Sequence, residues 1–212
     1  MVDFQDSSAG EGFESGILRL YGRGDEPVDE IVGLLNAINA AYEGLVRYEF
    51  LVTRLYIYWR HYSSRYDAFD RVHPELYYSY PANDLPPGFR LSLKGVRLQS
   101  PGFWDFFGKL NPLEVLRNAI NDAHERRKDR AYRESAEAKR LHLENIILEN
   151  EALSGRIAVL RDLGMTEEEM AQIRTTLIHQ PIERVLQFQN SRLIDSADLT
   201  PSRRTEPPST SG

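Results

Sequence analysis

The chain has 212 residues, with 26 Lys and Arg against 32 Asp and Glu, a formal net charge of −6, 41% hydrophobic residues and no cysteine. This apolar content is enough for a folded core, and the lack of cysteine excludes disulfides, thiolate metal sites and cysteine nucleophiles. The negative charge argues against a protein whose whole surface binds nucleic acid, although it permits a local basic patch. The uncharged stretches are too short to span a bilayer and the acidic start is unlike a signal peptide, so we expect a cytoplasmic protein without a membrane partner.

Both ends of the chain have a composition typical of disorder. Residues 1–15 combine Gly, Ser and acidic residues without periodicity, and residues 195–212 are rich in Ser, Thr and Pro. Neither stretch carries enough apolar surface to offset the entropy lost on ordering. We therefore expect a disordered N-terminus, a disordered C-terminal tail and a folded part between them.

The first expected elements are a strand and an amphipathic helix. Residues 17–21 alternate weakly between two glycines, which is typical of a strand. Residues 25–27 (Asp-Glu-Pro) indicate a helix start, because Pro fits the first turn and acids favour the helix N-terminus. The apolar residues that follow keep a spacing of three and four: Val28, Ile31, Leu35, Ile38, Tyr42 and Leu45.

Residues 46–70 have two interpretations. Their aromatic and branched side chains favour strands by propensity, whereas a helical apolar face continues through Leu51, Leu55 and Tyr58. No Gly or Pro interrupts this stretch, so the turn residues of a hairpin are missing. We expect a helix here and keep strands as the alternative.

A proline-rich loop and a second strand region come next. After the loop of residues 73–88, apolar residues alternate in 89–98 with a phase shift at Gly95, which indicates a bulge or a tight hairpin. Ser100 followed by Pro101 has the form of a helix start, so the sequence GFWDFF after it is expected to form a short helix.

A helical pattern then runs from Pro112 to Leu163 without another proline. Such a helix would be about 78 Å long, whereas a compact chain of this length is roughly 40–45 Å across. The helix must therefore either break or project and be covered by another partner. After Gly164, Thr166 and Glu169 have the spacing of a capping box, and the helix that they open is expected to be interrupted at Pro181.

The end of this long helix carries a heptad pattern. Its apolar positions follow steps of three and four, with an Asn at an a position, a residue that fixes register in two-stranded coiled coils. The alternative is a core helix within one subunit, with Asn150 hydrogen-bonded locally. The expected oligomerisation residues are Leu143, Ile146, Asn150, Leu153, Ile157 and Leu160.

The middle of the helix, residues 124–140, is a charged stretch with little apolar surface. It has the i,i+4 ion pairs that keep an exposed helix folded, so it is expected to act as a solvated stalk. Phosphate binding is the less favoured alternative for its cations, Arg126, Arg127, Lys128, Arg130 and Arg133.

Tyrosines and arginines are concentrated in residues 42–80. Such residues pack cores, recur at protein interfaces and stack on bases or sugars, and we rank these three roles in that order. The expected partner-binding residues are Arg54, Tyr58, Trp59, Tyr62, Arg65 and Tyr66. Asp67, Asp70 and His73 are too few to fix a metal site, and no phosphate loop or hydrolase motif occurs, so we expect neither metal nor cofactor.

Together these patterns predict an α+β, mainly α, fold. A head of residues 16–110 with two or three short strands would lead into a long helix, residues 111–163, made of the charged stalk 124–140 and the heptad segment 141–163. A C-terminal helical hairpin segment, residues 164–190, would follow, giving a short coiled-coil or hairpin tail.

The predicted function is that of a non-catalytic, homo-oligomeric adaptor or scaffold, with a dimer as the first expectation and a protein partner on the aromatic head. Nucleic-acid binding through residues 126–140 and 42–80 is the first alternative. An enzyme whose site is assembled across a subunit interface is the second.

Overall fold

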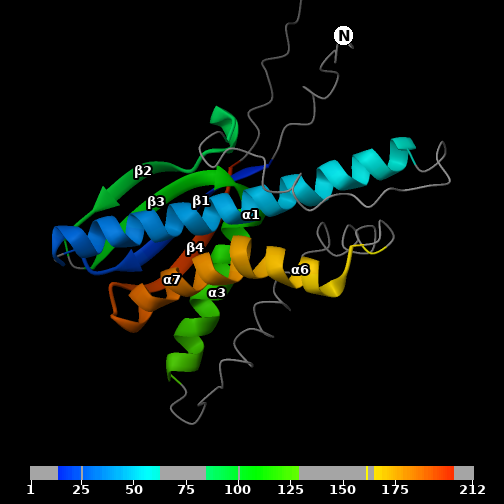
Figure 1. The fold of residues 1–212 in the computed structure, drawn as a ribbon. Helices are drawn as coiled ribbons and strands as arrows, with labels where there is room; N and C mark the ends of the chain where they lie inside the picture. The colour runs from blue at the N-terminus through cyan, green and yellow to red at the C-terminus, as the bar shows by residue number, and fades with distance from the viewer. Residues whose placement is uncertain are drawn as a thin grey trace, which may run out of the picture.

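The computed structural model describes residues 14–24, 26–62, 85–99, 101–128, 161 and 165–202, but not the side chains of 54–62 and 126–128. The predicted α+β fold is confirmed, and the described residues form four strands rather than the two or three expected (Figure 1). The elements in chain order are β1 (Ser15–Gly22), α1 (Val28–Tyr62), the 3₁₀ turn η1 (Pro87–Phe89), β2 (Ser92–Arg97), β3 (Gly102–Lys109), α3 (Leu110–Lys128), α6 (Glu167–Arg174), the π-helical turn η2 (Thr175–His179), α7 (Gln180–Asn190) and β4 (Ile194–Pro201).

The sheet has the strand order β2-β3-β1-β4, and all three neighbouring pairs are antiparallel. β1 and β2 are therefore parallel to each other with β3 between them, which is the split β-α-β arrangement. The central strand β1 pairs Ser15–Gly22 with Lys109–Gly102 on one side and Gly16–Gly22 with Pro201–Ile194 on the other. The first and last strands of the described chain thus lie side by side.

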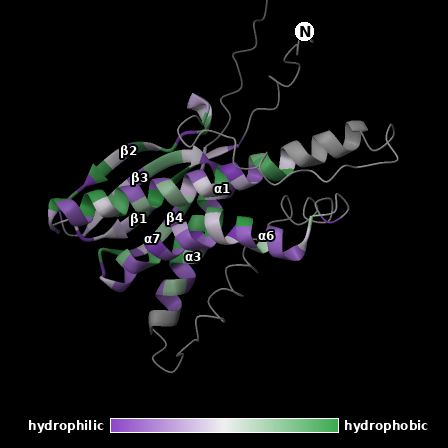
Figure 2. Ribbon diagram, viewed as in Figure 1, coloured by the Kyte–Doolittle hydropathy of each residue, from purple (hydrophilic) through white to green (hydrophobic). Residues whose placement is uncertain are grey.

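The helices of the described chain cover one face of this sheet. In β1 and β3 every second residue is buried, and Leu18, Leu20, Trp104 and Phe106 join one core cluster with residues of α1, α3 and α7. Figure 1 shows α1 lying across the sheet with α7 beside it. Figure 2 shows apolar and polar residues alternating along these ribbons, as expected for elements with one buried face.

Expectations about secondary structure are wrong at three places. The sequence GFWDFF forms most of β3 instead of a short helix, because its two faces pack differently: Trp104 and Phe106 are buried under the helices while Phe103 and Phe107 lie on the other face. Residues 195–201, expected in a disordered tail, belong to β4 and pair with β1. Ser15, at the end of the expected disordered N-terminus, is the first residue of β1.

Several local expectations are confirmed. α1 is a single helix through Tyr62, so the helical interpretation holds for residues 46–62. The ladder between β2 and β3 shifts register between Leu93 and Gly95, which is the expected bulge. Thr166 and Glu169 form a reciprocal capping box at the start of α6. The long helix begins at Leu110, two residues before Pro112. The described residues do not include the stalk beyond residue 128, the heptad segment apart from Arg161, or residues 1–13, 63–84 and 203–212.

The regular α-helix is interrupted just before Pro181, as expected: α6 ends at Arg174, and α7 begins at Gln180 with Pro181 in its first turn. Pro has no N–H to bond the carbonyl of Leu177, and its ring would crowd that carbonyl in an α-helix. The chain instead forms the π-helical turn η2, in which the N–H of Gln180 bonds the carbonyl of Thr175. The carbonyl of Leu177 lies against Gly44 of α1, where a Cβ atom would overlap it.

The turn from α7 into β4 is a Schellman motif. Leu193 N–H bonds Phe188 O at 2.9 Å and Arg192 N–H bonds Gln189 O at 3.0 Å, which satisfies two carbonyls at the helix end. Arg192 has a φ of 67°, a conformation that Gly usually adopts at this position. The motif directs the chain back along β1.

Tyr42 joins α1 to the sheet. Its hydroxyl accepts a hydrogen bond from the backbone N–H of Lys109 at 2.8 Å, and its ring lies over Gly108, which has no side chain to block it. Burial raises the pKa of Tyr42, opposed by this hydrogen bond and assisted by the charge of Glu49. Burial also raises the pKa of Tyr48, against the lowering effect of Arg174.

Replacing Gly44 with Ala tests the contact between α1 and the π-helical turn. The new methyl group would overlap the Leu177 carbonyl, a backbone atom that cannot rotate away. We expect Gly44→Ala to lower the free energy of unfolding by about 1–3 kcal/mol, measured by urea denaturation. Gly88→Ala is the matched control, because no atom lies within 4 Å of its Cβ position; equal effects of the two changes would contradict the packing described here.

Alkaline pH should destabilise the fold through Tyr42 and Tyr48. Because their pKa values are raised in the folded protein, the unfolded chain releases these protons first. Stability is therefore retained below the ordinary tyrosine pKa of about 10 and falls as the pH rises above it. Urea denaturation between pH 8 and 11 should show a shallower fall for Tyr48→Phe than for the wild type, and an identical fall would argue against this assignment.

Candidate functional site

The sheet face opposite the helices is the first candidate surface. It carries the outward residues of the two central strands: Ile17, Arg19, Tyr21, Phe103, Asp105 and Phe107. These side chains are partly exposed, whereas their neighbours in the sequence are buried. A face with aromatic side chains and charges at its centre can bind a flat or apolar ligand as well as a protein.

An ion pair occupies the centre of this open face. Arg19 and Asp105 are directly opposite in the β1–β3 ladder and form two hydrogen bonds, Nε to Oδ1 and Nη2 to Oδ2, both 2.7 Å long. The hydrogen bond to Asp105 is the main cause of the raised pKa of Arg19. The guanidinium also lies 4.3 Å from the ring centroid of Phe103. The pair therefore holds two neighbouring strands together and fixes an aromatic ring beside them.

Charge divides the open face into two halves. On the β4 side, the Tyr21 hydroxyl donates a hydrogen bond to Asp198 at 3.0 Å. On the β2 side, the Lys94 ammonium lies 5.3 Å from the ring centroid of Phe107, and Arg97 is paired in register with Phe103. The half next to β2 is thus cationic and aromatic, and the half next to β4 carries an acid.

The second candidate surface is apolar and lies at the β2 edge. Among the described residues, five of the six exposed large hydrophobic side chains belong to α1 or to β2 and the residue after it. They are Val28 (77% exposed), Val32 (47%), Leu93 (49%), Val96 (50%) and Leu98 (50%).

Helix periodicity places the residues from α1 and those from the β2 region on one side of the molecule. Val32 and Phe50 lie eighteen residues apart, which is five full turns of α1, so they share a helix face. The Phe50 ring lies 4.7 Å from that of Phe89, just before β2. The turn before α1 lies against the end of β2, since a Cβ atom on Gly24 would overlap the backbone of Leu98. We call Val28, Val32, Leu93, Val96 and Leu98 the β2-edge patch.

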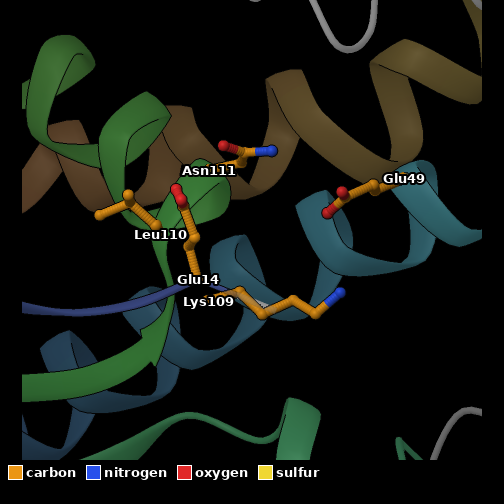
Figure 3. Close-up of a pocket in the computed structure, with 5 residues that line it drawn as sticks. All are labelled: Glu14, Glu49, Lys109, Leu110 and Asn111. Atoms are coloured by element: carbon orange, nitrogen blue, oxygen red, sulfur yellow. The ribbon is translucent and has the colours of Figure 1, made fainter. Parts of the chain in front are cut away.

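A small polar pocket lies where β3 passes into α3 (Figure 3). Its volume is about 150 Å³, and it is lined by Glu14, Glu49, Lys109, Leu110 and Asn111. Lys109 is 7% exposed, with its ammonium 3.9 Å from the ring centroid of Phe89 and 5.2 Å from that of Phe50.

The pocket suits a few waters better than a substrate. Pockets for small-molecule ligands usually measure about 300–1,000 Å³, and one water takes about 30 Å³. Its two carboxylates, Glu14 and Glu49, are too few for a metal site. No group of three or more His, Asp or Glu suited to a metal occurs in the described parts of the chain. Likewise, none of the helices that the structure describes is long and apolar enough to cross a bilayer.

Most of the site residues predicted from the sequence fall outside what the structure describes. The six heptad residues, Arg130, Arg133, Arg65 and Tyr66 belong to segments without described structure. Arg126, Arg127 and Lys128 lie in the last turn of α3, and Arg54, Tyr58, Trp59 and Tyr62 lie at the end of α1, with their side chains not described. Their roles remain predictions.

The residues of the two surfaces were missed by the sequence analysis. Phe103 and Phe107 alternate with Trp104 and Phe106, and that period of two was a readable strand signal. The pairing of Arg19 with Asp105 had no sequence signal, because it depends on the register between strands far apart in the chain.

Comparison with known proteins adds no relative. A scan against protein-family models and searches of curated proteins and of solved structures each find no match for this chain.

Proposed function

We propose that this protein is a non-catalytic adaptor that self-assembles through its heptad segment and binds a protein partner through the folded sheet domain. The observation that carries the partner-binding part is the β2-edge patch. Exposed apolar residues gathered in one place commonly mark interaction sites. The small pocket gives less support to catalysis, because it is polar and limited in volume.

Self-assembly rests on the heptad pattern of residues 141–163 in the sequence. In that pattern Leu153 occupies a d position and Leu148 the outward f position. Their replacement by Asp introduces the same charge into the proposed interface and outside it. The two variants are therefore a matched pair.

Light scattering of the full chain at about 50 µM tests this assembly, because ordinary dimers have dissociation constants well below that concentration. We expect a dimer for the wild type and for Leu148→Asp, and a monomer for Leu153→Asp. A monomeric wild type, or equal behaviour of the two variants, would exclude assembly through this heptad register.

Asn150 provides a separate test of the register. A buried Asn at an a position costs stability and specifies pairing, so Asn150→Leu should raise the melting temperature while allowing other oligomers. Thermal denaturation and light scattering on the same samples measure the two effects. An unchanged dimer with a lower melting temperature would contradict the assignment of position 150.

Nucleic-acid binding is the second candidate, and the open sheet face favours it. Phe103 and Phe107 belong to the central strand β3 and lie beside the cations Arg19 and Lys94. Aromatic side chains on a sheet can stack on the bases of single-stranded nucleic acid. Binding of a labelled single-stranded oligonucleotide should weaken steeply with salt and should be lost in Phe103→Ala/Phe107→Ala. Circular dichroism confirms that the variant is folded, and absence of wild-type binding at about 50 mM salt would remove this candidate.

A further inference from the structure

The two edges of the sheet differ. At the β4 edge, the side-chain amide of Asn121 in α3 bonds both backbone groups of Ala197: its Nδ2 donates to the carbonyl and its Oδ1 accepts from the N–H, each at 2.8 Å. α3 therefore covers that edge. At the other edge, the described residues supply β2 with one strand neighbour, β3.

β2 presents different chemistry on its two faces. Leu93 and Val96 are paired in register with the buried Phe106 and Trp104, so they lie on the helix side of the sheet and remain about half exposed. Lys94 lies by the Phe107 ring on the open side. The segment 92–98 contains two cations and no acid.

Natural edge strands are usually short, charged or covered, because an uncovered edge with apolar side chains can pair with another chain. The charges of β2 fit that pattern, but its apolar side does not. On that side α1 adds Val28 and Val32. A strand beside β2 would cover Leu93 and Val96 and could reach the apolar start of α1.

We propose that β2 accepts an added strand from a partner protein. The partner segment is extended and alternates in sequence, with apolar residues on the helix side and acidic residues opposite Lys94 and Arg97. Backbone hydrogen bonds would supply affinity, and the alternating side chains would supply specificity. This inference rests on the proposed adaptor function and specifies the chemistry of its partner.

Charge argues against a second copy of the same strand as the occupant. Two β2 strands paired antiparallel would bring the cations of one copy close to those of the other, and like charges across a strand pair are unfavourable. Acidic side chains opposite Lys94 and Arg97 form favourable cross-strand pairs instead. The charge of the edge therefore selects an acidic partner.

Two designed peptides test this by fluorescence anisotropy with the full chain at low salt. One is acetyl-Ser-Val-Glu-Val-Glu-Val-Glu-Ser-amide with a fluorophore, and the other has Lys in place of each Glu. The wild type should bind the acidic peptide at least tenfold more tightly than the basic one. Lys94→Glu/Arg97→Glu should reverse this preference, whereas Leu93→Asp/Val96→Asp should lose binding of both peptides.

Arg184→Glu/Arg192→Glu is the matched control, because it changes the net charge equally at exposed positions on α7 and in the turn after it. This variant should keep the wild-type preference, and circular dichroism verifies that every variant is folded. Equal binding of both peptides by the wild type, no binding at millimolar peptide, or loss of preference in the control would overturn the proposal.

Two further outcomes would also overturn it. A lower oligomer mass for Leu93→Asp/Val96→Asp in light scattering would make a second copy the occupant. Loss of oligonucleotide binding by Lys94→Glu/Arg97→Glu, without any peptide binding by the wild type, would make nucleic acid the ligand of these cations. Neither failure changes the test of self-assembly at Leu153 and Leu148, so the two proposals fail separately.

Discussion

The fold depends on the pairing of β1 with a strand on each side. Its partners β3 and β4 come from later in the chain, and β4 is the last described element before Ser202. Leu18 and Leu20 are fully buried at this centre. Because contacts between residues distant in sequence pay a large loop-closure entropy, the sheet is expected to form late and cooperatively. The helices between the strands must bring the chain back to this one strand.

The arrangement of the helices determines which surfaces remain for function. α1, α3 and α7 share one face of the sheet, and α3 also covers the β4 edge through Asn121. The opposite face keeps the Arg19–Asp105 pair and its aromatic neighbours partly exposed. The β2 edge keeps both cations and apolar side chains. The two candidate surfaces are therefore adjacent, since Lys94 contributes to the open face from the same strand that carries the β2-edge patch.

The elements that local chemistry specifies were predictable from the sequence. Helix spacing identified α1, the glycine identified the bulge in β2, and Thr166 with Glu169 identified the cap of α6. These features depend on neighbouring residues. Ser100 and Pro101 have the form of a helix start and so favoured a helix for the residues of β3, although the alternation of their aromatic side chains favoured a strand.

Other features depend on contacts between distant parts of the chain. β4 contains two Asp and a Pro, residue types that are depleted in strands, and it is ordered by backbone pairing with β1 and by Asn121. The candidate surfaces have the same origin, because strand register places Arg19 opposite Asp105. No single-sequence pattern contains that register.

The π-helical turn makes two positions of the C-terminal helix interdependent. Buried residues recur at steps of three or four on either side of it, but Ile173 and Ile178 are five apart, so the turn holds one residue more than a regular helix needs. Deleting Thr176 would return the apolar side chains to regular spacing, yet it would leave Pro181 inside an ordinary helix with a clashing carbonyl. Replacing Pro181 with Ala would remove that clash, but the extra residue would stay in the helix although no proline would then require it. The proline and the extra residue therefore compensate for each other, and a variant that loses both should tolerate the change better than one that loses either.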